Sequence, residues 1–192
     1  VYGFYPQATV ERIDDYNIFN PEGQSAGGFF TLTKNNVLPL KTYKTLEIDP
    51  LESISNALSK IDEIGEGGTI QLILKPAGKD WNRGGLAIAK RMNQGLTLKE
   101  ALAGKQLKKP KPNEPQIQPK VSPQDEEIIK SLQEKTAKMG FQVNLRLVFS
   151  SRDKEGAKEL MSHAQGAFNQ FSSPNLNALK FKELKGEKLK KL

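Results

Sequence analysis

Hydrophobic and polar residues alternate most clearly from 141 to 149, where the odd positions are Phe, Val or Leu and the even positions begin with Gln142, Asn144 and Arg146. A period of two predicts a β-strand with one buried face. From 157 to 171 the apolar residues take the spacing of a helix, which predicts an amphipathic helix that covers this face. We expect this strand and helix to form the centre of the core.

Similar patterns predict the other elements. Asp49 and Ser122 are helix-capping residues, and each is followed by Pro at the first helical position. Ile73 is apolar on the second face of its strand, which favours a central place in the sheet. In chain order, we expect strands at 29–33 and 37–43 joined as a hairpin, a helix at 50–61, a strand at 69–75, helical segments within 80–104, a helix from 123 that stops at Gly140, and a final strand at 178–184.

These elements predict an α+β fold with a mixed or antiparallel sheet and with helices packed mainly on one face; a ferredoxin-like arrangement is one such topology. We expect a single domain at 1–184. Within it, residues 105–121 combine four prolines with lysines and glutamines, a composition typical of a flexible Pro/Lys-rich linker. Residues 185–192 form a basic tail.

The formal net charge of +7 raises the question of nucleic-acid binding. Residues 105–120 hold five lysines and one glutamate, and residues 180–192 hold six lysines and two glutamates, so the rest of the chain is close to neutral. We therefore expect the positive charge to lie in the linker and the tail rather than on a folded face. The candidate nucleic-acid contacts are Lys105, Lys108, Lys109, Lys111, Lys188, Lys190 and Lys191.

Residues that carry chemistry are scarce in this sequence. The chain has no Cys and a single histidine, His163, and no segment matches the phosphate-binding pattern G-x-x-x-x-G-K-[ST]. The acidic cluster at 125–127 is typical of a helix N-terminus. The sequence thus predicts no catalytic residues, no cofactor and no metal site, and we expect this chain not to be an enzyme.

Trp81 and Arg83 are the candidate contacts for a protein partner. A lone Trp beside an Arg is a frequent anchor at protein interfaces. The alternative is that Trp81 packs in the core, which is the more common role of such a residue.

Several short motifs resemble the domain that precedes the motor in conjugation-type ATPases of the FtsK/HerA class, which are related to type IV secretion. The resemblance covers most of residues 8–181. The motifs are Thr31-Leu-Thr-Lys, Leu38-Pro-Leu-Lys-Thr-Tyr, Asp49-Pro-Leu, Ala57-Leu-Ser-Lys, Gly65-Glu, Ile70-Gln-Leu-Ile-Leu-Lys-Pro, Glu134-Lys135, the segment Phe141 to Phe149, and Ala167-Phe-Asn-Gln-Phe-Ser-Ser-Pro-Asn-Leu-Asn.

The resemblance implies a non-catalytic assembly or scaffold domain that acts through protein contacts with other subunits or domains of a translocation machine, or with copies of itself. It implies a bacterial, cytoplasmic domain at the inner face of the membrane, in a parent protein whose ATPase lies downstream. The absence of an initiator Met at Val1 and of an apolar run long enough to span a membrane fits such an excised piece. The alternative is a domain that binds DNA weakly and without sequence specificity through the lysine-rich linker and tail.

Overall fold

The computed structural model describes residues 3, 6–12, 17, 19, 21–46, 49–61, 64–78, 80–106 and 121–192. Its elements, in chain order, are β1 (Gln24–Leu32), η1 (Tyr43–Thr45), α1 (Pro50–Leu58), β2 (Gly67–Pro76), α2 (Arg83–Asn93), α3 (Leu98–Leu102), α4 (Pro123–Thr136), β3 (Phe141–Ser151), α5 (Lys154–Ala167), η2 (Phe168–Phe171), β4 (Leu179–Leu184) and α6 (Glu187–Lys190).

The four strands form one sheet in the order β2-β3-β1-β4, and every neighbouring pair is antiparallel. Together with α1 and α5, this order gives the βαββαβ connectivity of the ferredoxin-like arrangement. Helices α2, α3 and α4 are an insertion between β2 and β3. The prediction of an α+β fold with an antiparallel sheet is confirmed.

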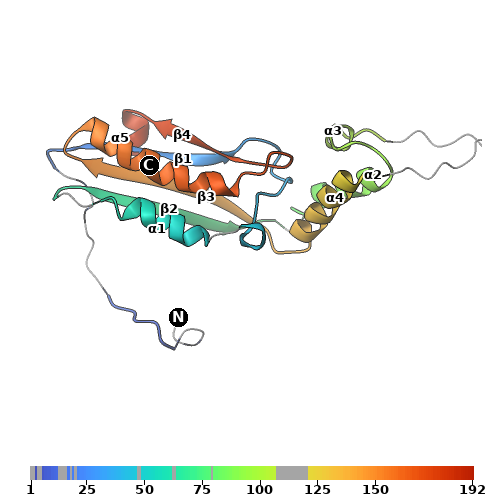
Figure 1. Ribbon diagram of the computed structural model, residues 1–192, viewed down its shortest axis with the longest axis horizontal. Coiled ribbons are helices and arrows are strands. Elements are labelled where there is room, and N and C mark those ends of the chain that lie inside the picture. Colours follow the sequence, from blue (N-terminus) through green and yellow to red (C-terminus); the bar gives the residue numbers. More distant parts are fainter. Residues whose placement is uncertain are drawn as a thin grey trace, which may run out of the picture.

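Helices α1 and α5 lie side by side on one face of the sheet (Figure 1). The buried core between them and the strands includes Leu147 and Phe149 of β3, with Leu160 and Ala164 of α5. Phe30 of β1 continues this core through ring contacts with Phe168 and Phe181. The strand and helix predicted as the centre of the core are therefore confirmed.

A second core lies within the insertion, which Figure 1 shows beyond one end of the sheet. Ile88 and Met92 of α2 pack there with Ala101 of α3 and Leu132 of α4. The ends of the insertion meet where the Ala77 N–H donates to the Gly140 carbonyl at 2.9 Å. Leu38, from the loop after β1, is also buried in this second core.

The predicted hairpin partner at 37–43 is wrong, because these residues form no strand. Leu38 is apolar because it fills the second core, and the Lys41 N–H pairs with the Phe171 carbonyl at 2.9 Å rather than with β1. The predicted strand at 29–33 begins earlier, at Gln24. Its glycines are required there, since a Cβ on Gly28 would collide with the Lys182 carbonyl of β4.

The prediction that the strand of Ile73 is central is also wrong, because β2 lies at the edge of the sheet. Ile73 is apolar on the second face without being buried. The linker predicted at 105–121 falls largely on residues 107–120, which lie outside the described part of the chain.

Candidate interaction surfaces

The helix-side face of the sheet is covered over only part of its length. At the far end of β2 and β3, four large side chains that belong to this face by strand register remain exposed. They are Leu72 at 57%, Leu74 at 53%, Phe141 at 50% and Val143 at 57%. We call these four residues the β2–β3 apolar patch. Phe141 and Val143 were expected to be buried, but the cores of α1 and α5 reach only as far as Leu145 on this strand.

The patch adjoins an open strand edge. Among the described strands, β2 pairs with β3 alone. Apart from Lys75, no residue from Gly67 to Pro76 is charged. Natural proteins usually protect such edges with charges, prolines or bulges, because an exposed edge can pair with another chain. Here the protecting residues, Lys75 and Pro76, stand only at the end of the strand.

Among the described helices, only α6, near the C-terminal end, lies on the other face of the sheet. The ideal Cβ position of Gly27 lies 3.0 Å from Cδ1 of Leu189 and 3.2 Å from Cδ2 of Leu192, so these two side chains cover part of β1. The Arg146 guanidinium donates a hydrogen bond to the Leu192 carbonyl. Residues of this open face include Lys180 and Lys182 of β4.

The expectation that the positive charge avoids the folded faces is therefore wrong for Lys180 and Lys182. The two lysines alternate along β4 with Leu179 and Phe181, which pack against the helix-side core. Strand geometry then directs the lysines to the opposite face.

The predicted protein contacts, Trp81 and Arg83, lie where the insertion leaves the sheet. Trp81 is half-buried, and its indole lies against the backbone of Gly140, where any Cβ would collide with the ring. Arg83 is exposed and forms an ion pair with Asp80 at 3.0 Å. Trp81 thus packs within the chain, at the junction of the insertion and β3.

Among the described residues, the predicted nucleic-acid contacts of the linker and of the tail are not brought together. Lys105 follows α3 in the insertion and pairs with Glu100 at 3.3 Å, while α6 contacts β1 of the sheet and the two elements lie apart in Figure 1. Lys188, Lys190 and Lys191 are exposed in or just after α6, and Lys190 pairs with Glu187 at 2.9 Å. Lys108, Lys109 and Lys111 lie outside the described residues.

The acidic cluster after Ser122 caps α4, as expected. The Asp125 N–H donates to the Ser122 hydroxyl at 3.1 Å, and that hydroxyl donates to the Asp125 carboxylate at 2.6 Å. A comparable capping box starts α3, where hydrogen bonds from Thr97 hold the pKa of Glu100 below its usual range. The carboxylates therefore serve the helix N-termini.

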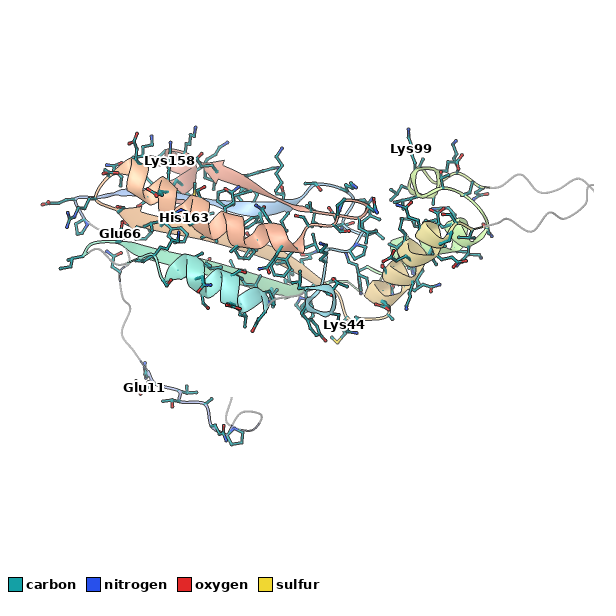
Figure 2. The ribbon with its side chains drawn as sticks, in the orientation of Figure 1. Glu11, Lys44, Glu66, Lys99, Lys158 and His163 are labelled. Atoms are coloured by element: carbon teal, nitrogen blue, oxygen red, sulfur yellow. The ribbon has the colours of Figure 1, made fainter. Side chains whose placement is uncertain are left out.

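Figure 2 shows His163 on α5, the helix that also carries Lys158 on its exposed side. His163 is half-buried, and its Nδ1 atom is buried without a hydrogen-bond partner in the described part of the chain. Within the same described ranges, no group of His, Cys, Asp or Glu residues is placed to hold a metal ion. None of the described helices is long and apolar enough to cross a membrane.

Sequence reasoning missed two polar residues that hold the loops between the cores. Asn177 is fully buried and joins the 33–38 loop to the start of β4. Lys135 of α4 donates to the Asn36 and Leu38 carbonyls at 2.5 and 3.2 Å. Burial lowers the pKa of the Lys135 ammonium group. Asn177 ends one of the motifs that carry the resemblance, but no local pattern indicates the structural role of either residue.

Comparison with curated proteins and with solved structures finds no match to this chain. A family model described as a domain of unknown function, DUF8128, matches residues 1–190. The sheet, the insertion and both exposed surfaces fall within that match, and the chain belongs to the DUF8128 family.

Proposed function

We propose that this is a non-catalytic assembly domain, which acts through protein contacts at the β2 edge and the adjoining β2–β3 apolar patch. The observation that carries the proposal is the coincidence of a strand edge left open by the described strands with four exposed large apolar side chains. Contiguous exposed apolar surface of this kind marks interaction sites in soluble proteins. An open edge adds backbone hydrogen bonds to the same contact.

The occupant we propose is a second copy of the chain, with its β2 strand antiparallel to the first. A two-fold axis through Leu72, perpendicular to the sheet, keeps the helix-covered faces of both copies on the same side. This register places Leu72 opposite its own copy, Leu74 opposite Ile70, and Lys75 opposite Thr69. No like charges then face each other across the new strand pair, and the apolar patches of both copies become continuous.

The sequence motifs support a finer proposal, that the parent protein is a conjugation-type translocation ATPase of the FtsK/HerA class and that this domain assembles its subunits at the cytoplasmic side of the membrane. This proposal rests on the resemblance alone. Sequencing the gene beyond the codon for Leu192 tests it. An open frame that encodes a G-x-x-x-x-G-K-[ST] motor downstream supports it, whereas a stop codon directly after Leu192 contradicts it.

Light scattering coupled to size exclusion tests the proposed assembly. We expect the wild-type chain to form a dimer whose population rises with concentration. The double variant Leu72→Glu/Leu74→Glu should be monomeric, because the two carboxylates at position 72 would face each other across the joined strands and each carboxylate at position 74 would face the apolar side chain of Ile70. The far-UV circular dichroism of the variant should be unchanged, since both side chains are exposed.

The matched control is Leu86→Glu, which places a carboxylate at a similarly exposed leucine on α2, within the insertion. We expect this control to remain dimeric. Self-association would be ruled out if the wild-type chain stays monomeric up to about 1 mM. A dissociation constant of that size corresponds to a binding free energy of about −4 kcal/mol. A double variant that remains dimeric would place the contact elsewhere.

A further inference from the structure

Within the four strands, the side chains of the open face carry positive charge and no negative charge. Strand register assigns to this face the odd positions of β1 and β2 and the even positions of β3 and β4. Its charged side chains are Lys75, Arg146, Lys180 and Lys182. No Asp or Glu occupies a position of this face within the four strands.

Two of these cations flank an aromatic ring. Arg146 on β3 is the register partner of Phe29 on β1, and Phe29 is the partner of Lys182 on β4. Adjacent strands are about 4.8 Å apart, so the two cations stand about 10 Å from each other across the Phe29 position. Phe29 is half-buried, in a row that continues to Gln71 on β2.

Uncharged polar side chains occupy the neighbouring rows. Asn144 and Gln142 of β3 pair in register with Ile73 and Lys75 of β2, and Thr31 of β1 pairs with Lys180 of β4. The face therefore combines an aromatic ring, amide groups that can hydrogen-bond in both directions, and cations on both sides of the ring.

We propose that this open face binds single-stranded nucleic acid, with a base stacked on Phe29 and with phosphates held by Lys180, Lys182 and Lys75. Some RNA-binding domains present aromatic residues of a four-stranded sheet to unpaired bases, and cations that follow the nucleic-acid backbone supply sequence-tolerant affinity. The major groove of a duplex admits a helix or a two-stranded ribbon, and the face of a four-stranded sheet is wider than such a ribbon, which favours the single strand.

Helix α6 defines one end of this binding face. Its Leu189 side chain and that of Leu192 cover Gly27, two residues from Phe29. The bond from Arg146 to the Leu192 carbonyl fixes the chain beside the ring. The bound nucleic acid therefore runs from the Phe29 ring toward Lys180 and Lys75, away from α6. The exposed lysines of the C-terminal segment lie near the end of the nucleic acid that is next to α6.

Fluorescence anisotropy tests the proposal by measuring the affinity of the chain for labelled nucleic acid. The probes are single strands of deoxythymidylate and of uridylate, each compared with the corresponding duplex, at about 50 mM and about 200 mM salt. For the variant Lys180→Gln/Lys182→Gln we expect at least about a tenfold loss of affinity for the single strands. The plot of log affinity against log salt has a negative slope, and the magnitude of this slope should fall by about 1.4, since each lost phosphate contact contributes about 0.7.

The matched control is Lys154→Gln/Lys158→Gln on α5, which removes the same charge from the helix-covered side of the domain. We expect the affinity of this control variant for the single strands to stay within about twofold of wild type. Its two lysines lie on the helix-covered side of the sheet, and the bound nucleic acid lies on the opposite side. The variant Phe29→Leu keeps an apolar side chain but no stacking surface, and should lose about five- to a hundredfold.

Equal losses in the face variant and the α5 control would overturn the proposal, because affinity would then follow net charge alone. No binding of either strand at about 50 mM salt would also overturn it. Binding to vesicles of anionic lipid, with none to either strand, would assign the face to a membrane surface instead. The variant Leu72→Glu/Leu74→Glu should keep wild-type binding per chain, which separates this proposal from that of self-association.

Discussion

Asn177 joins the 33–38 loop to the segment that leads into β4. Its amide nitrogen donates to the Asn35 carbonyl at 2.9 Å and the Leu38 carbonyl at 3.2 Å, and its oxygen accepts from the Lys34 N–H at 3.0 Å. The side chain is fully buried. A buried amide stabilises the fold when all of its hydrogen bonds are made. If a partner is lost, the buried group left without a hydrogen bond costs its desolvation free energy.

Replacing Asn177 tests this role. We expect Asn177→Ala to lower the free energy of unfolding by about 3 kcal/mol or more, because it removes the bonds and leaves buried carbonyl groups without donors. Urea denaturation measures the change. The matched control is Asn175→Ala, an exposed asparagine of the same loop, which should change stability by less than about 0.5 kcal/mol. Similar effects of the two substitutions would contradict the role assigned to Asn177.

Lys135 makes stability depend on pH in the alkaline range. Burial lowers its pKa in the folded chain from the value of 10.5 expected when unfolded. Between the two pKa values the unfolded state binds more protons, so the free energy of unfolding rises with pH toward 10.5. We expect Lys135→Met to lose this rise. Urea denaturation between neutral pH and the alkaline limit measures it.

The exposed Lys130 of the same helix provides the control for that experiment. Lys130→Met removes the same charge from α4 and should retain the wild-type pH dependence. An equal alkaline rise in wild type and Lys135→Met would show that the buried ammonium group does not set it.

At the scale of elements, the helices were easier to predict than the strands. Asp49 caps α1 and Ser122 caps α4 in the structure, as their sequence signals indicate. A cap is a local interaction between residues two or three positions apart, so the sequence carries it directly. Strand pairing joins residues far apart in the chain. The sequence therefore predicted that 69–75 is a strand, but not that it lies at an edge.

The cap of α4 is testable by itself. We expect Ser122→Ala to lower the free energy of unfolding by about 1 kcal/mol, because the Asp125 N–H loses its acceptor. Thermal denaturation measures the effect, and Ser122→Asp, which retains a capping oxygen, should restore most of the stability. A Ser122→Ala variant as stable as wild type would mean that water replaces the cap at no cost.

Across the molecule, the described residues form two cores, one between the sheet and α1 and α5, the other among α2, α3 and α4. The 33–38 loop ties them together through Leu38, which belongs to the second core, and through Asn177. Regions with separate cores can unfold separately when few contacts join them.

Hydrogen exchange distinguishes separate from concerted unfolding. Leu132 and Leu147 are fully buried, one in each core, so replacement of either by Ala should cost about 2–5 kcal/mol. We expect Leu132→Ala to accelerate exchange in α2 and α4 while the amides of β1 and β3 keep their protection. Equal acceleration in both regions would show that the two cores unfold as one unit.

Local patterns in the sequence predicted the helices, most of the strands, the caps and the α+β class, because each depends on residues that are close along the chain. They did not indicate which strand is the edge, that Leu38 packs in the core of the insertion, or that Lys180 and Lys182 share a face with Phe29 and Arg146. The physical reason is strand register: it fixes which distant residues stand together and which face they take, and no local pattern encodes the partner.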